Sequence, residues 1–398
     1  MARKSGGRRP ATRLTHGGSD PPRQHGVVNP PVYRASTVLF PSVAALREAS
    51  ANPLRGVYYG RYGTPTHFAF EEALTGLESG AHGAVTTSSG LAAISVALLS
   101  VLKAGDHVLV ADNVYAPTRK LCDGLLKSLG IETTYFDPLM QPELIAALFR
   151  PATRALFLES PGSLTFEICD VPALAALAHQ RGAAVLMDNT WATPLYFQAL
   201  AHGVDIAIYA ATKYLVGHAD AMLGSLVCNE AQYLPVKRTA VALGQCAGPD
   251  DVYLGLRGLR TLAVRLQQHG AAALQLTQWL RRQPEIARIL YPALADDPGH
   301  PLWQRDFTGA SGLFGLVLKE GIGEAALTAM LDGFELFGLG YSWGGYESLI
   351  IPTHPAEARS ATSWQGGPAL RIHAGLEDPA DLIADLERGF ERLRNYSG

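Results

Sequence analysis

Cysteine, net charge and long apolar runs are all scarce in this sequence of 398 residues. The four cysteines form neither a CxxC pair nor a Cys/His spacing typical of metal ligands. We therefore expect no disulfide framework, no metal site, and reduced thiols in a cytoplasmic protein. Because 33 basic residues nearly balance 36 acidic ones, the composition does not favour nucleic acid or an anionic membrane as a partner. No apolar run reaches the ~20 residues that a membrane-spanning helix needs.

Hydrophobic residues make up 47% of the chain, which is typical of a protein that folds around a core and excludes wholesale disorder. Basic residues are dense in the first 23 positions, where Arg8 and Arg9 resemble an export signal. No apolar stretch follows them, so we expect a solvated or partner-clasping arm, with a short nucleic-acid tail as the alternative. Residues 27–40 are rich in proline and β-branched side chains, and we predict an extended N-terminal arm over residues 1–58.

Apolar runs alternate with helical patterns between residues 59 and 250. A helix is expected from Thr64 and Pro65 onward, because these residues suit the cap and the first helical position. The alternation predicts an α/β domain with a large, doubly wound, mainly parallel sheet. Strands are expected at 84–87, 107–112, 156–160, 183–189 and 205–211, and further helices at 91–102, 118–128, 142–149 and 171–181.

The pattern changes after about residue 250. Residues 252–280 predict two long helices, and an amphipathic helix is expected at 378–393. Strands of a second sheet are expected at 286–292, 311–319 and 369–375. We therefore predict a smaller C-terminal α+β domain over residues 251–398.

Lys213 and Asp188 each follow an apolar strand, and ligands of open α/β sheets bind at the carboxyl ends of the strands. A desolvated lysine can bond to an aldehyde, and a buried carboxylate can keep a pyridine nitrogen protonated. Pyridoxal phosphate (PLP) requires both. Taken alone, Lys213 is more typical of a lysine that reaches from a strand end to solvent, and Asp188 is slightly more typical of a helix cap. The pair together favours PLP.

Residues 88–91 join a strand to a helix, and Gly90 and Leu91 offer the first backbone N–H groups of that helix to a phosphate. The alternative is an ordinary serine cap. Tyr115 follows the strand at 107–112, where its ring can stack on a cofactor or simply pack in a loop. Each of these signals is weak in isolation.

Arg371 interrupts an apolar strand, where a guanidinium favours a carboxylate of a ligand or of an internal ion pair. Residues 340–344 match the G-x-S-x-G pattern of serine hydrolases, with Ser342 as the nucleophile. That motif needs a helix directly after the serine, and the sequence here predicts a turn followed by a strand. A hydrolase is therefore a remote alternative.

Together these residues resemble the Cys/Met-metabolism family of PLP-dependent enzymes, which have the fold type I architecture. The resemblance extends from about Thr12 to Leu393. The segments that carry it are RLTHGG, VNPPVYRAST, YGRYGTPTHF, MDNTW, ATKYLVGHADAM, RGLRTLAVRLQQH, DFTGASGLF, YSWGGYESL and RIHAGLED.

The resemblance implies a role for each candidate residue that binds PLP. The family's cofactor-bearing lysine falls on Lys213, its pyridinium partner on Asp188 and its stacking tyrosine, a second candidate for proton transfer, on Tyr115. The phosphate loop falls on the backbone of Gly90 and Leu91. A hydroxyl for the phosphate also comes from the residue just before the lysine, Thr212.

The resemblance also implies how the substrate is bound and how subunits combine. The family's carboxylate-binding arginine falls on Arg371, with Ser342 and Trp343 beside it. Tyr59 and Arg61 match residues that reach the phosphate of a neighbouring subunit. This implies a homo-oligomer with shared active sites, usually a tetramer built as a dimer of dimers.

Two positions resemble the bacterial β-lyase branch of the family. Trp343 stands where γ-lyases and γ-synthases commonly carry leucine, and Ala210 where they commonly carry serine. The branch implies α,β-elimination of L-cystathionine to homocysteine, pyruvate and ammonia, a step toward methionine. The alternatives within the family are a γ-lyase and a cystine or cysteine desulfhydrase.

Overall fold

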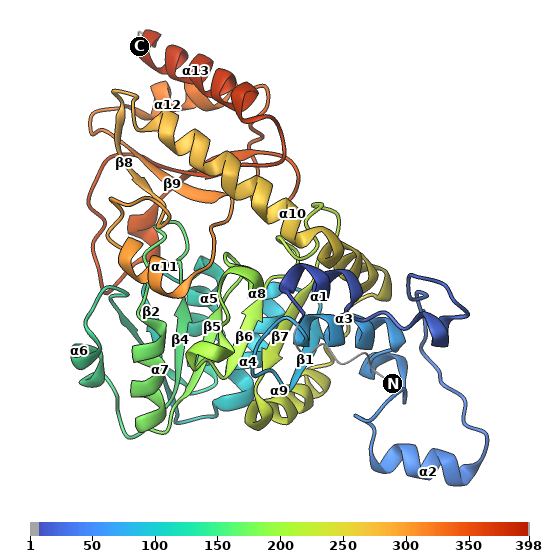
Figure 1. Cartoon of the computed structure of the whole chain (residues 1–398). Coiled ribbons are helices and arrows are strands. Elements are labelled where there is room, and N and C mark those ends of the chain that lie inside the picture. The colour runs from blue at the N-terminus through green and yellow to red at the C-terminus, as the bar shows by residue number, and fades with distance from the viewer. Residues whose placement is uncertain (1–7, 397–398) are drawn as a thin grey trace.

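The computed structural model describes residues 8–396, which form two sheets flanked by helices (Figure 1). The larger sheet has seven strands in the order β1-β7-β6-β5-β4-β2-β3. Within it only β7 runs antiparallel to its neighbours, so the predicted mainly parallel sheet is confirmed. Its strands are β1 (Gly83–Thr87), β2 (His107–Ala111), β3 (Glu132–Phe136), β4 (Thr153–Glu159), β5 (Ala184–Asp188), β6 (Ile206–Tyr209) and β7 (Gly224–Cys228).

The smaller sheet is antiparallel throughout, in the order β10-β11-β9-β8. Its strands are β8 (Ile286–Leu290), β9 (Leu313–Leu318), β10 (Leu349–Thr353) and β11 (Ala369–His373). All four lie beyond residue 250, and all seven strands of the larger sheet lie before it. The division into an arm at 1–58 and domains at 59–250 and 251–398 stays a prediction.

Short-range signals fix most of the helix starts. The Thr64 side chain and His67 form a capping box at α3, and the side chains of Ser89 and Asp170 cap α4 and α7. The helices are α1 (Pro10–His16), α2 (Val43–Ala51), α3 (Pro65–Thr75), α4 (Gly90–Val101), α5 (Ala116–Leu121), α6 (Pro142–Ala146), α7 (Val171–Gln180), α8 (Thr193–Tyr196), α9 (Glu230–Ala242), α10 (Pro249–Leu280), α11 (His300–Asp306), α12 (Glu324–Leu331) and α13 (Pro379–Asn395).

Three features differ from the sequence-based expectation. Residues 252–280 belong to one helix, α10, because the sequence has no proline in its interior and its buried glycines serve close packing instead of ending it. Strands β3 and β7 were not expected, since one is a polar, partly exposed edge strand and the other follows a loop without a periodic pattern. The predicted extended arm contains α1 and α2, although residues 27–40 are free of helix and strand.

Within residues 8–396, no helix has the length and apolar character required to cross a membrane. The same residues contain no group of three or more His, Cys, Asp and Glu side chains placed to hold a metal ion.

Candidate active site

Four parallel strands of the larger sheet end at one edge, and a reactive side chain lies at or just past each end. Tyr115 follows β2, Glu159 ends β4, Asp188 ends β5, and Lys213 follows β6. Glu159 and Asp188 are register partners, and the backbone N–H of Tyr115 donates to Oε2 of Glu159 at 2.7 Å. The sheet therefore brings Lys213, Asp188 and Tyr115 to one place, as the sequence predicted from their positions at strand ends.

The surroundings of Lys213 favour the neutral form of its amine, which is the nucleophilic form. Its Nζ donates to Oγ of Ser342 at 2.7 Å and lies 5.5 Å from the ring centre of Trp343. Burial and then the nearby charge of Arg371 lower the pKa of Lys213, Asp188 opposes both effects, and the resulting pKa is about 8. A substantial part of the amine is thus neutral near pH 8, unlike an ordinary lysine.

Asp188 is 8% exposed and offers one oxygen to a ligand. The backbone N–H and the hydroxyl of Thr190 both donate to Oδ1, at 3.0 and 2.5 Å. Oδ2 has no hydrogen-bond partner within residues 8–396 and is left for a bound ring. Burial raises the pKa of Asp188, while Thr190 and then Lys213 oppose the rise.

Two polar residues of this edge were not singled out from the sequence. Glu159 lies beside Asp188, and burial together with the Asp188 charge raises its pKa well above the usual range. Thr190 holds Asp188 and also accepts the backbone N–H of Ala210 at 2.9 Å, which links β5 to the segment that carries Lys213. The signal for Glu159 was its place at a strand end, and for Thr190 the MDNTW segment.

Arg371 of β11 comes from the smaller sheet to the same site. Its Nη2 donates to the backbone carbonyl of Ser342 at 3.0 Å, and no carboxylate within residues 8–396 forms an ion pair with it. The alternative of an internal ion pair is therefore wrong for this part of the chain. Burial lowers the pKa of Arg371 to about 10, and the neighbouring Tyr115 and Tyr341 act in the opposite direction. The guanidinium stays charged at neutral pH and is available to an anion.

Ser342 lies between Arg371 and Lys213, since its carbonyl oxygen accepts from the first and its hydroxyl from the second. No helix follows Ser342; the chain continues through a turn into β10, and so the geometry of a hydrolase nucleophile elbow is missing. Trp343, the next residue, packs at 5.3 Å from the ring of Tyr214.

The N-terminus of α4 faces the segment that carries Lys213. A Cβ atom on Gly90 would lie 2.5 Å from Cβ of Ala210, so only glycine allows this approach. Leu91 follows on the first helical turn, whose N–H groups have no partner inside the helix. The hydroxyl of Thr212 bonds to the backbone of Leu223, accepting from its N–H at 2.9 Å and donating to its carbonyl at 3.1 Å.

Tyr59 and Arg61 have contacts elsewhere. Nη1 of Arg61 donates to the carbonyl of Val241 at 2.7 Å, and the hydroxyl of Tyr59 accepts from Ser36 at 3.4 Å. Within residues 8–396, neither side chain forms a hydrogen bond or an ion pair with Lys213, Asp188 or Arg371. Within one chain, Tyr59 and Arg61 therefore lie outside the Lys213 group, by which we mean Lys213 and the residues around it, Asp188, Tyr115, Ser342 and Arg371.

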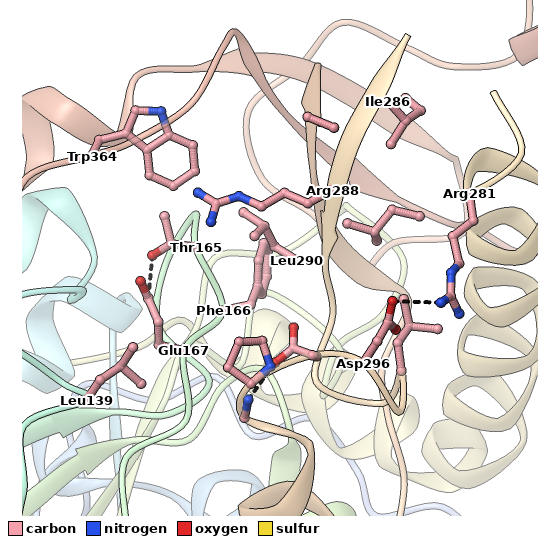
Figure 2. Close-up of a pocket in the computed structure, with 16 residues that line it drawn as sticks. Leu139, Thr165, Phe166, Glu167, Arg281, Ile286, Arg288, Leu290, Asp296 and Trp364 are labelled. Atoms are coloured by element: carbon pink, nitrogen blue, oxygen red, sulfur yellow. Dashed lines mark hydrogen bonds and ion pairs between the residues drawn. The ribbon is translucent and has the colours of Figure 1, made fainter. Parts of the chain in front are cut away.

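A separate cavity of about 530 Å³ lies between β8 and the loops near residues 165 and 296 (Figure 2). Arg281 and Asp296 form an ion pair of 2.6 Å at its wall, and Arg288 lies 4.9 Å from the ring centre of Trp364. No residue of the Lys213 group lines this cavity. The cavity is therefore distinct from the candidate active site.

Comparison with known proteins identifies a family whose cofactor fits the arrangement of Lys213, Asp188 and Tyr115. The profile of the Cys/Met metabolism PLP-dependent enzyme family matches residues 11–391. The chain belongs to this family. PLP is accordingly the cofactor, and the fold type I architecture and the α/β class predicted from the sequence are confirmed.

Relatives within the family cover nearly the whole chain. Cystathionine beta-lyase MetC of Escherichia coli strain K12 is 44% identical, over 96% of this chain and 98% of the relative. A cystathionine beta-lyase of Bordetella avium is also 44% identical, over 96% of this chain and 97% of the relative. The crystal structure of cystathionine gamma synthase from Xanthomonas oryzae pv. oryzae is 32% identical, covers 97% of this chain and 99% of its own, and superimposes with a TM-score of 0.88.

Proposed function

We propose that this family member is a cystathionine β-lyase, which eliminates homocysteine from L-cystathionine and releases pyruvate and ammonia. The observation that carries the proposal is the chain of contacts from Lys213 through Ser342 to Arg371. It places a nucleophilic amine next to a guanidinium that has no acidic partner within residues 8–396. An α-amino acid fits this arrangement, because its carboxylate can bind Arg371 while its amine approaches the position of Lys213.

The residues at the strand ends fit PLP. Lys213 would bond to the aldehyde, the free Oδ2 of Asp188 would accept a ring N–H, and Tyr115 would stack on the ring. The first N–H groups of α4, at Gly90 and Leu91, would bind the phosphate. Thr212, already bonded to Leu223, adds its hydroxyl near the phosphate. When bound, PLP supplies an electron sink for the α-carbon of the substrate.

Two side chains of this site can move protons. Lys213, with a pKa of about 8, is partly neutral at physiological pH and can take the α-proton and later protonate the leaving sulfur. Burial, with the charges of Glu159 and Asp188, raises the pKa of Tyr115, and so its phenol stays protonated and can donate. Arg371 holds the carboxylate during these transfers, which keeps the α-proton aligned with the lysine.

The position of Trp343 favours cleavage at the β-carbon. Its ring centre lies 5.5 Å from Nζ of Lys213, and Ser342 is the preceding residue, so the ring adds bulk where the substrate would bind. γ-Elimination needs a second proton to be removed, from the β-carbon, before the leaving group departs. We infer that Trp343 orients L-cystathionine with its cysteine half toward Lys213, and the β C–S bond breaks. The two relatives at 44% identity are β-lyases by name, which supports this choice.

The assembly we propose is a homo-oligomer, with Tyr59 and Arg61 directed to the active site of a second copy of this chain. Their lack of bonds to the Lys213 group within one chain supports this arrangement. A dimer of dimers and a cytoplasmic location stay predictions.

The experiment that tests the function identifies the keto acid formed from L-cystathionine by chromatography. We expect pyruvate together with homocysteine, and no product from the Lys213→Ala variant. Mostly 2-oxobutyrate together with cysteine would show a γ-lyase. No keto acid from the PLP-loaded wild-type protein would overturn the lyase assignment for this substrate.

A further inference from the structure

A cluster of buried rings includes Tyr214, the residue that follows Lys213. Tyr214, His269 and His373 are each at most 1% exposed. The ring centres of the two histidines are 5.1 Å apart, and that of Tyr214 lies 5.4 Å from His269 and 5.8 Å from His373. Burial, followed by the neighbouring His269, lowers the pKa of His373 to about 3, and so its ring is neutral at working pH.

His373 is tied to the segment that carries Ser342 and Trp343. Its Nε2 lies 3.2 Å from the backbone nitrogen of Gly344 and 3.1 Å from the carbonyl oxygen of Gly345. In either tautomer this nitrogen forms one hydrogen bond to the segment, as acceptor or as donor. Nδ1 has no partner within residues 8–396, so this bond is the polar contact that offsets burial of the ring.

The same segment lies against the backbone of Lys213. Gly344 has φ +85°, and a Cβ atom there would lie 2.8 Å from the nitrogen of Tyr214 and 2.9 Å from the carbonyl carbon of Lys213. Ser342 has φ +83°, a conformation that a residue with a side chain keeps only when its surroundings hold it. The close contact and the unusual backbone indicate that residues 342–345 are held in one position.

We propose that His373 is a positioning residue that holds residues 342–345 so that Ser342 and Trp343 face Lys213. Arg371 and His373 are two residues apart on β11, and therefore point to the same side of the strand. Arg371 binds the carbonyl of Ser342, and His373 binds the backbone just beyond it. Strand β11 thus bonds to the 342–345 segment at two points, at Ser342 through Arg371 and at Gly344 or Gly345 through His373. The inference rests on the proposed roles of Arg371 and Ser342 in binding the substrate carboxylate.

The test compares His373→Phe, which keeps the ring volume and removes the nitrogen atoms, with His373→Gln, which retains polar atoms. His269→Phe is the matched control, because His269 is equally buried but bonds to the carbonyls of Ala374 and Gly375 instead of the 342–345 segment. Steady-state kinetics with L-cystathionine and hydrogen exchange of the peptide that contains residues 342–345 are measured for each PLP-loaded variant.

For His373→Phe we expect kcat/KM to fall about ten- to hundredfold, mainly through KM, because misplacing a binding group by about 1 Å has effects of this size. Exchange in the 342–345 peptide should rise several-fold, and His373→Gln should recover part of both values. His269→Phe should lose stability while its KM and the exchange of that peptide stay near wild type.

Equal KM and exchange in His373→Phe and wild type would overturn the proposal, and so would an equal rise in KM in the His269→Phe control. Failure of the proposed function is a separate result. In that case the wild-type protein itself forms no pyruvate from L-cystathionine, and hydrogen exchange still decides whether His373 holds the segment.

Discussion

Lys213 is the residue on which the site depends, and its neighbours have opposite effects on the pKa of its amine. Burial and the charge of Arg371 favour the neutral amine, whereas Asp188 favours the charged one. The balance lowers the pKa to about 8. Because only the neutral amine attacks an aldehyde, the surroundings decide at which pH the PLP-free protein takes up its cofactor.

We therefore expect the rate at which PLP attaches to the PLP-free protein to rise with pH, reach half of its maximum near pH 8 and level off above that pH. An ordinary lysine would continue to rise toward about pH 10.4. In Arg371→Met the rise should move to higher pH, since the positive charge that disfavours protonation of Lys213 is gone; Arg371→Lys keeps the charge and is the control. Borohydride reduction and peptide mapping at each pH measure the attachment. An unchanged midpoint in Arg371→Met, or label away from Lys213, contradicts this prediction.

Trp343 gives a second prediction at the residue scale. Trp343→Leu removes the aromatic contact near Lys213, and the loss of about 1–3 kcal/mol in positioning lowers kcat/KM for pyruvate formation roughly five- to 150-fold. The fraction of 2-oxobutyrate among the products should rise. Trp364→Leu is the matched control, because Trp364 lines the separate cavity. A similar loss in both variants would show that Trp343 has no particular part in choosing the bond.

The sequence located Lys213, Asp188 and Tyr115 at or just past strand ends, but it missed residues whose part in the site depends on contacts between strands. These three could be proposed because Asp188 and Lys213 come at the ends of apolar runs and Tyr115 lies shortly after another. Glu159 reaches Asp188 only through the register of β4 and β5, and His373 reaches Gly344 only because β11 passes behind that segment. Neither contact can be predicted from a local pattern of residues, because each joins segments that are far apart in the sequence.

At the scale of elements, α10 shows why one expectation was wrong. The helix runs from Pro249 to Leu280 past the larger sheet and on to the smaller one (Figure 1). The carbonyls of Leu215 and Val216 lie where a Cβ atom on Gly258 would be, at 2.2 and 2.4 Å. A glycine that permits this contact resembles a helix break in the sequence, but in the structure it joins α10 to the segment after Lys213.

Substitution of this glycine tests the contact. Gly258→Ala should destabilise the protein by about 1–3 kcal/mol, because the clash with two carbonyls exceeds the higher helix propensity of alanine. Gly124→Ala is the matched control, since its Cβ would meet nothing within 4 Å, and we expect its stability to be unchanged or slightly higher. Chemical denaturation followed by circular dichroism measures both. A Gly258→Ala variant as stable as Gly124→Ala would show that α10 can move away from the Lys213 segment without cost.

For the same reason, the fold was easier to predict where elements are buried and periodic. The strands that end at the site were expected because they are continuous apolar runs, as is typical of strands covered on both faces. Edge strand β3, with three threonine and glutamate residues among its five, has no such run. Tertiary pairing with β2 makes it a strand, and a single sequence does not contain that information.

At the scale of the whole molecule, most of residues 27–57 are exposed, although Pro31 and Tyr33 bond to Thr66 and Arg34 pairs with Asp250. Helix α2 contains no buried residue and lies apart from the body of the molecule (Figure 1). The exposed fractions of apolar side chains here are high, at 89% for Leu39, 72% for Val28 and 64% for Val43. Exposed apolar side chains gathered in this way are typical of an interaction surface, and the segment leads directly to Tyr59 and Arg61, which we propose serve a second copy.

This geometry makes a prediction about mixed subunits. Arg61→Ala alone should retain PLP weakly, and Lys213→Ala alone should be inactive. After denaturation and joint refolding of the two variants, a hybrid pair has one site with Lys213 from one chain and Arg61 from the other. With random pairing we expect about a quarter of the wild-type activity for pyruvate formation. Each variant refolded by itself is the control. If exchange is proven with two distinguishable tags and no activity returns, Arg61 serves the active site of its own chain, and the shared-site assembly is wrong.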